Sequence, residues 1–177
     1  EKPFCVLLHP TAPHRNWLPD PKHLDLYKGE TKPLPATFYD DYATRSDAAR
    51  TQEMRIADHM MIGHDLKLTP DATPADDTPA EALLRKQWEG NLARMTPEER
   101  EAFTKAYAEE NAAFRAAGLE GKALAEWKYQ RYIKDYLRCI ASVDDNVGRV
   151  LDYLDAEGLA EATPDIYTSD QGFYLGE

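Results

Sequence analysis

Cysteine is scarce in this sequence, and so are the patterns in which cysteine binds metal. The 177 residues include two cysteines, Cys5 and Cys139, and neither has metal-ligand spacing. Cys5 lies in a strand-like segment and Cys139 in a helix-like one, so we expect two buried free thiols and no disulfide. So few cysteines do not identify a redox compartment.

Long apolar runs and positive charge are scarce as well. No stretch approaches the roughly 20 apolar residues that cross a membrane, so we expect no membrane as a partner. Lysine and arginine total 21 against 32 aspartates and glutamates, which gives a formal net charge of -11. A surface this acidic argues against nucleic acid or an anionic membrane as a partner. An anionic substrate would need cations that are gathered locally.

Several common motifs are missing. The sequence has no Walker loop, no GxGxxG, no GxSxG and no internal repeat. It opens on Glu1 without an initiator methionine or a signal peptide, and it stops at Glu177, directly after a strand-and-loop motif. We therefore expect an internal segment of a larger protein, and the missing leader says nothing about export.

Two short apolar runs predict strands. Pro3–His9 is almost continuously apolar, and Asp165–Thr168 is rich in β-branched and aromatic residues, as in buried strands of a parallel sheet. A long helical crossover separates them, so the sequence predicts an α/β fold with a mostly parallel sheet flanked by helices. Each run leads into a polar loop, and such sheets bind ligands at the carboxyl ends of their strands. We expect both loops at one edge.

The crossover contains four helical patterns. The predicted helices cover 46–61, 79–95, 96–117 and 122–158; Thr96 and Glu99 form a capping-box pattern, and Gly118 suits a left-handed cap. Residues 65–78 are rich in proline, aspartate, threonine and alanine, which predicts an exposed linker.

The two polar loops hold the candidate functional residues. Asp170 and Gln171 offer oxygen atoms, the ligands that Ca²⁺ and Mg²⁺ prefer, and Gly172 permits a sharp turn beside them. Taken alone, such a sequence is more often a turn than a metal site. The first loop carries His14 and Arg15, and a lone loop histidine is more often a surface or packing residue.

Other groups of oxygen-bearing side chains are weaker metal candidates. Asp40 and Asp41 are expected to be solvated loop carboxylates. Asp144, Asp145 and Asn146 interrupt a helical apolar stripe, and they lack the alternating oxygens and closing glutamate of an EF-hand. We expect them to be polar residues on a helix face.

Three segments resemble the sulfatase family of the alkaline-phosphatase-like superfamily. YTSDQGFYLGE resembles the second metal-binding segment of that family, ASVDDNVGRVLDYLDAEGLAEATPDIYTSDQG resembles the helix and strand before it, and LHPTAPHRNWLP resembles the histidine-bearing loop. The resemblance is weakest between about Asp65 and Arg94. It implies that residues 1–177 are the central part of a single sulfatase catalytic domain, incomplete at both ends, within an alkaline-phosphatase-like sandwich.

The resemblance also implies roles for single residues. His14, within APHRNW, corresponds to the catalytic histidine, and Asp170 and Gln171 to ligands of Ca²⁺, with Mg²⁺ less expected. Apart from the resemblance, Arg15 is a candidate to pair bidentately with a sulfate or a sugar carboxylate, and Trp17 to stack on a pyranose, although residues of both kinds are more often structural. The family nucleophile is a formylglycine made within a C/S-x-P/A-S/A-R motif. Neither cysteine has that context, so we expect the nucleophile outside this chain.

A further segment, KHLDLYKGETKPLPATFYDDYATR, resembles sulfatases that act on sulfated glycans, including those that remove 6-O-sulfate from glucosamine. The implied function is metal-assisted removal of sulfate from a sulfated carbohydrate by a periplasmic, extracellular or lysosomal enzyme, and this segment alone is expected to be inactive. Two alternatives remain open. One is a phosphodiesterase or phosphonate monoester hydrolase of the same superfamily, and the other is a non-catalytic helical interaction module.

Overall fold

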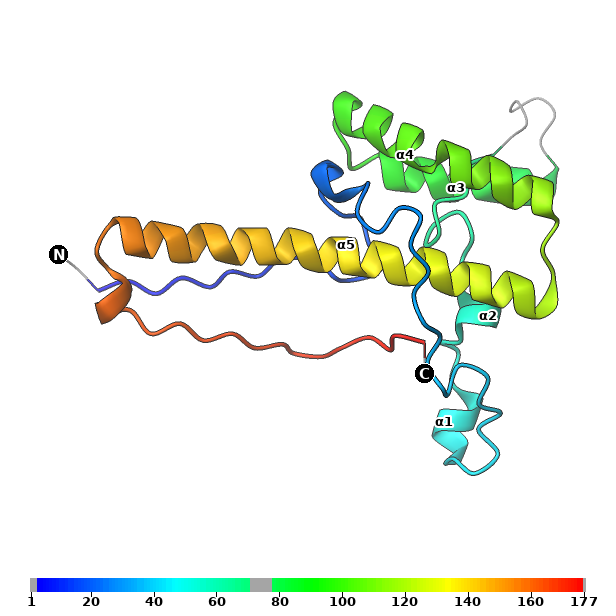
Figure 1. Cartoon of the computed structure of the whole chain (residues 1–177), viewed down its shortest axis with the longest axis horizontal. Helices are drawn as coiled ribbons and strands as arrows, with labels where there is room; N and C mark the ends of the chain where they lie inside the picture. The colour runs from blue at the N-terminus through cyan, green and yellow to red at the C-terminus, as the bar shows by residue number, and fades with distance from the viewer. Residues whose placement is uncertain (1–2, 71–77, 177) are drawn as a thin grey trace.

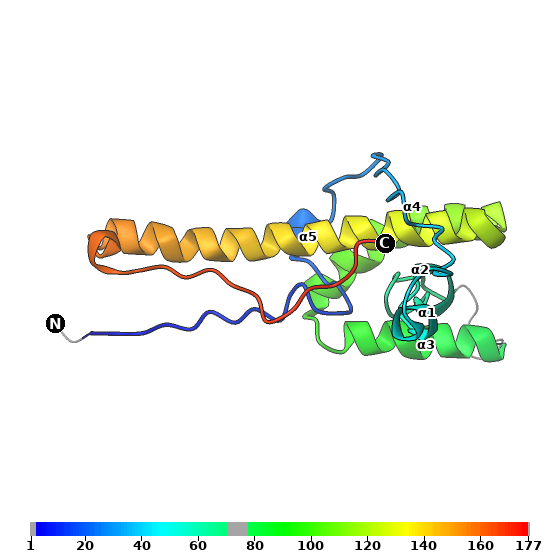
Figure 2. The ribbon, with the colours of Figure 1, turned by 90° about the horizontal axis from the view of Figure 1, so that it is seen from below.

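The computed structural model describes residues 3–70 and 78–176. Its architecture is organised around one long helix, α5 (Gly121–Ala156), with α3 (Pro79–Leu92) and α4 (Pro97–Ala117) beside the N-terminal half of α5 (Figures 1 and 2). The C-terminal half of α5 extends beyond them. Four short elements complete the described chain: η1 (Pro21–His23), α1 (Asp47–Thr51), α2 (Ile56–His59) and η3 (Ala160–Ala162).

The long helices begin and end at local signals in the sequence. Thr96 and Glu99 form a reciprocal capping box at the start of α4, and Pro97 occupies its first turn. At the other end Gly118 adopts φ 54°, a left-handed conformation that glycine reaches without the usual side-chain penalty. The capping box and the left-handed glycine were both predicted, and the structure confirms them.

The helix predicted over residues 46–61 is instead two short helices, α1 and α2. Residues 52–55 between them are not helical, and the backbone at Gln52 is extended. No residue of α1 is buried, whereas Ile56 of α2 packs into the core. Short helices depend on tertiary packing, so the segment is helical over only a few residues.

The segment predicted as an exposed linker is buried at its start. Asp65, Leu66, Lys67 and Leu68 are each at most 3% exposed, so the prediction is wrong for this part. Charged and apolar residues alternate here, a pattern that predicts at most one buried face and not the burial of Asp65 and Lys67. The rest of the predicted linker includes residues 71–77, which lie outside the described residues.

The two predicted strands are extended but unpaired. The described residues form no β-strand, and residues 3–10 and 164–172 are exposed, with Leu7 at 75% and Ile166 at 87%. Cys5 is exposed too, which corrects its predicted burial, whereas Cys139 is a buried free thiol. Both segments run in the same direction along α5 (Figures 1 and 2). The predicted burial fails because no neighbouring strand in the described chain pairs with either run.

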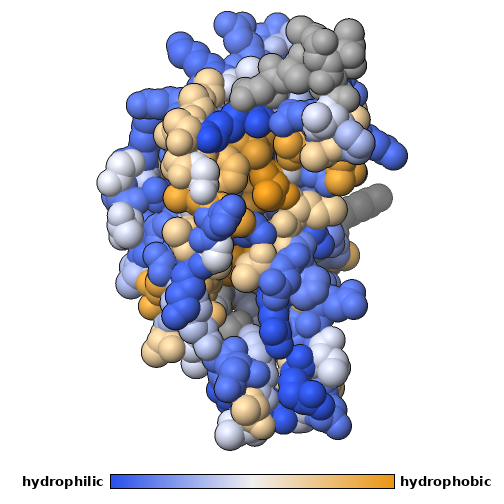
Figure 3. Space-filling view, turned by 90° about the vertical axis from the view of Figure 1, so that its right-hand side faces the viewer, coloured by the Kyte–Doolittle hydropathy of each residue, from blue (hydrophilic) through white to orange (hydrophobic). Residues whose placement is uncertain are grey.

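Two apolar clusters hold the helices together. The larger joins the first loop and α2 to α5; its buried members are Trp17, Ile56, Met60, Leu66, Tyr129, Tyr132, Ile133 and Cys139. The smaller joins η1 and its neighbours to α3 and α4 through Leu24, Trp88, Phe103 and Tyr107. On the face of the molecule seen in Figure 3, apolar residues gather within a hydrophilic surround. Among the described residues, no helix is long and apolar enough to span a membrane.

Candidate active site

The two polar loops meet on one residue of α5, Tyr132. Its ring lies 4.6 Å from Trp17 and 5.9 Å from Phe173, measured between ring centroids, and Trp17 and Phe173 are 5.1 Å apart. The Tyr132 hydroxyl donates a hydrogen bond of 2.6 Å to the carbonyl oxygen of Tyr174. Edge-to-face aromatic pairs of this kind stabilise a packing arrangement as well as burying area. The aromatic cluster therefore anchors both loops to the same part of α5.

His14 lies three residues before Trp17 and is exposed. Its Nδ1 atom lies 2.6 Å from the carbonyl oxygen of Arg15. A carbonyl accepts, so Nδ1 carries the proton, and in the neutral ring Nε2 is the acceptor. The backbone N–H of His14 also bonds to the carbonyl of Thr11 at 2.9 Å. The loop therefore presents an imidazole with a defined tautomer to solvent.

Arg15 is paired within the protein. Its Nε and Nη2 atoms donate to the two carboxylate oxygens of Asp65, at 2.7 and 2.5 Å. The Asp65 carboxylate also accepts from the backbone of Met61. Burial acts to raise the pKa of Asp65, but these hydrogen bonds outweigh it and hold the pKa below its usual range. The bidentate pairing predicted for a substrate anion is made here with Asp65.

Trp17 is fully buried, with 0% exposure. Its indole packs against Tyr132 and Phe173 and leaves no face free for a sugar. The predicted stacking on a pyranose therefore has no support in this arrangement. Trp17 contributes to packing between the loop and α5.

A buried ionic cluster lies behind the loops. Asp135 of α5 is 0% exposed; one of its oxygens accepts from Lys67 at 2.9 Å, and the other accepts from Tyr107 and Arg138, both at 2.8 Å. Burial acts to raise the pKa of Asp135, but the charges of Lys67 and Arg138 outweigh burial and lower it. Lys67 also donates to the carbonyl of Asp65, so the cluster connects α4 and α5 to the residue that holds Arg15.

Sequence reasoning missed Asp65, Lys67 and Asp135. The available signal was the spacing of Arg131, Asp135 and Arg138, because charges of alternating sign at i, i+4 and i+7 share one helix face. Charged side chains spaced in this way more often face solvent than the core, so the pattern did not single out these residues.

Asp170 and Gln171 lie in an exposed loop three and two residues before Phe173. The Ser169 hydroxyl donates to the carbonyl of Gln171 and tightens the loop. Within the described ranges, no group of three or more histidine, cysteine, aspartate or glutamate side chains could hold a metal ion. The carboxylate and carboxamide fit a hard cation chemically, but Ca²⁺ takes six to eight oxygens. These two residues can contribute only part of such a site.

Two of the weaker metal candidates, Asp40 and Asp145, have structural partners. Asp40 accepts from Arg45 at 2.8 Å and from the backbone of Tyr42. Asp145 pairs with Lys22 and His23 of η1, at 2.7 and 2.5 Å. Asp40 stabilises the turn that follows it, and Asp145 stabilises the contact between α5 and η1. Both lie outside the aromatic cluster.

Comparison with known proteins relates this geometry to an enzyme family. The model of the Sulfatase family matches residues 1–177. An N-acetylglucosamine-6-O-sulfatase of Bacteroides thetaiotaomicron is 43% identical over 176 residues, which cover 99% of this chain and 30% of that protein. A solved structure, described as a complex with its substrate D-glucosamine-2-N,6-O-disulfate, shares 41% identity and a TM-score of 0.79 over 94% of this chain and 32% of its own.

The chain thus spans about a third of the length of each of these relatives. The family match, in contrast, extends over every residue of the chain. The resemblance of this chain to the sulfatase family is therefore confirmed, and the chain belongs to that family.

Proposed function

We propose that the protein containing this chain is a sulfuric ester hydrolase that removes sulfate from a sulfated carbohydrate. The proposal is supported by the family, by the relative named N-acetylglucosamine-6-O-sulfatase and by the related structure in complex with a disulfated glucosamine. The observation that carries it is the anchoring of the His14 loop and the Asp170 loop to one tyrosine of α5. The same support favours this function over a phosphodiesterase or a helical interaction module.

In the proposal, His14 works on the leaving oxygen of the sulfate ester. A departing alkoxide needs a proton, and a positioned imidazole near neutral pH is suited to supply it. The hydrogen bond from Nδ1 to the Arg15 carbonyl orients the ring. In the proposed step the doubly protonated ring gives its Nε2 proton to the leaving oxygen and becomes neutral, with the proton on Nδ1 still in place. Arg15 and Asp65 act as positioning residues, since their ion pair holds the loop that carries His14.

Asp170 and Gln171 would contribute oxygen ligands to a divalent cation, Ca²⁺ before Mg²⁺. When bound, such a cation neutralises charge on the sulfuryl oxygens and helps to place the nucleophile. The nucleophile itself is proposed to be a formylglycine outside these 177 residues, because neither Cys5 nor Cys139 lies in the required motif. The extended segments 3–9 and 165–168 are proposed to join further strands in a mostly parallel sheet.

The test compares Asp170→Ala with Asp144→Ala in the full-length protein. Asp144 is an exposed carboxylate with no ion pair in the described part of the chain, so its removal should leave turnover close to that of the parent protein. Asp170→Ala should lower kcat by at least about a hundredfold, since both charge neutralisation and placement are lost. The measurement is sulfate release from a 6-O-sulfated glucosamine, with a phosphate diester assayed in parallel. Equal losses in both variants would contradict the metal assignment, and preference for the diester would contradict the substrate class.

A further inference from the structure

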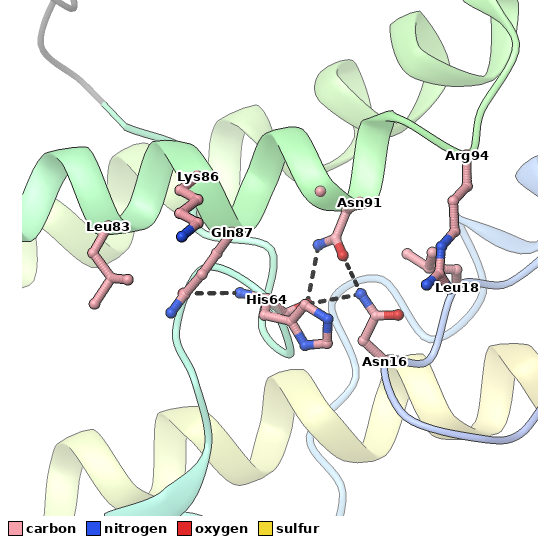
Figure 4. A pocket seen from close by; sticks show the side chains of 9 residues that line it. Asn16, Leu18, His64, Leu83, Lys86, Gln87, Asn91 and Arg94 are labelled. Carbon is pink, nitrogen blue, oxygen red and sulfur yellow. Dashed lines mark hydrogen bonds between the residues drawn. The ribbon is translucent and has the colours of Figure 1, made fainter.

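A basic pocket lies beside the histidine loop. Its volume is about 320 Å³, and it is bounded by α3, by the loop after His14 and by His64 (Figure 4). Its polar lining consists of Asn16, His64, Lys86, Gln87, Asn91 and Arg94. Two leucines and a glycine complete the lining, and no acidic residue of the described chain takes part.

The charge of this pocket is opposite to that of the whole molecule. Lys86 and Arg94 lie on its rim and are exposed, and neither has an ion pair with the described residues. Other cationic side chains near the core form ion pairs, as Arg15 does with Asp65 and Lys67 does with Asp135. In a chain of net charge -11, two unpaired cations at one concave surface form a local site for an anion.

The floor of the pocket is ordered by buried amides. Asn91 is 1% exposed and Asn16 7%, and the two side chains hydrogen-bond to each other. Asn91 also donates to the carbonyl of His64 at 3.0 Å, and Gln87 accepts from the backbone N–H of His64 at 3.2 Å (Figure 4). These contacts fix the His64 segment against α3 before any ligand arrives, which reduces the entropic cost of binding.

The pocket is also close in sequence to the proposed catalytic group. Asn16 and Leu18 of its lining lie two and four residues after His14 on the same anchored loop. A ligand in the pocket would therefore contact the same short loop that carries His14. An extended glycan can reach both the pocket and His14, whereas a single small anion occupies one.

We propose that this pocket binds an anionic substituent, a sulfate or a carboxylate, of a sugar next to the one that is desulfated. Lys86 and Arg94 supply the charge, and His64 and Gln87 lie beside them in the pocket lining. The inference rests on the proposed function and adds a preference for glycans with a neighbouring anion over isolated monosaccharides.

The test uses the full-length protein with the double variant Lys86→Gln, Arg94→Gln. The matched control is Lys105→Gln, Arg149→Gln, which removes the same charge from exposed positions of α4 and α5 outside the pocket. Four substrates are compared. One is a 6-O-sulfated glucosamine monosaccharide, and the others are oligosaccharides whose neighbouring sugar carries a sulfate, a uronic acid carboxylate or no charge. Thermal midpoints establish that each variant is folded.

The pocket variant should raise KM for an anionic oligosaccharide about tenfold, which corresponds to about 1.4 kcal/mol. Its kcat on the monosaccharide and its KM on the neutral oligosaccharide should remain those of the parent. The effect should shrink at high salt, because exposed charges are screened. The sulfate and carboxylate arms identify the preferred anion.

Two outcomes would overturn different claims. If the parent hydrolyses the monosaccharide but the pocket and control variants have equal KM values on both anionic oligosaccharides, the pocket inference is wrong and the proposed function stands. If the parent hydrolyses none of the sulfate esters, the proposed function fails first.

Discussion

At the scale of single residues, the strongest electrostatic feature is the burial of Asp135 among three donors. Lys67, Tyr107 and Arg138 satisfy its carboxylate completely, and the carboxylate in turn compensates the buried Lys67. A buried ion pair is weak evidence for net stability, but removing one partner is costly because the other charge is left uncompensated.

We therefore predict that Asp135→Asn lowers the free energy of unfolding by about 3–5 kcal/mol at pH 7. The folded-state pKa of Asp135 is lowered, so its stabilising contribution is present above the unfolded pKa of about 3.9 and is lost as the pH falls through the folded-state value. The difference in the free energy of unfolding between the Asp135→Asn variant and the parent should therefore become smaller in that acidic range. Urea unfolding of both proteins at several pH values measures this difference.

Asp144→Asn is the matched control, since Asp144 is exposed on the same helix. Its effect should stay within about 0.5 kcal/mol. An Asp135→Asn variant as stable as this control at pH 7 would show that the buried cluster contributes nothing.

Single residues also show where sequence reasoning ends. His14 and Asp170 were singled out as candidates because the residues around them resemble a family pattern. Asp65 has no such pattern, and its role depends on Arg15, which lies 50 positions earlier in the chain. A pairing over that separation follows from tertiary structure, so periodicity and local propensity could not predict it.

At the scale of elements, the ends of the helices were the most predictable features. Thr96, Pro97, Glu99 and Gly118 define α4 through contacts within a few residues of each end. The division into α1 and α2 was not predictable in the same way, because helix length there depends on which residues find a packing partner.

The capping box leads to a direct prediction. Thr96→Ala should lower the free energy of unfolding by about 1 kcal/mol, because the backbone N–H of Glu99 loses its side-chain acceptor. Thr96→Ser keeps the hydroxyl and should remain close to the parent. Thermal and urea unfolding of both variants distinguish the lost hydrogen bond from a lost methyl group; equal losses would point to the methyl group.

At the scale of the whole molecule, the two extended segments lack strand partners within the described chain. Residues 3–9 and 165–168 have strand-like composition but exposed side chains, and both run along α5 in the same direction (Figures 1 and 2). Strand identity depends on partners distant in sequence, so composition predicted the extended backbone and not its pairing.

Amide hydrogen exchange on the full-length protein tests the proposed sheet. Backbone amides of residues 5–9 and 165–168 should exchange roughly a hundredfold or more slowly than the same residues in an unstructured peptide. Exchange as fast as in the unstructured peptide would show that these segments stay unpaired.

The length of α5 sets the distance that the chain must cover to return to Tyr132. From Tyr132 to Ala156 the helix covers about 36 Å at 1.5 Å per residue, and the chain must return over a similar distance to bring Phe173 back to Tyr132. Seventeen residues, Glu157 to Phe173, make that return and can reach at most about 60 Å. One helical turn added beyond Tyr132 would lengthen the outward path by about 5 Å, to about 41 Å, which seventeen residues can still span. Phe173 could then still reach Tyr132 through a more extended return segment, so the anchor of the Asp170 loop tolerates a change in the length of α5.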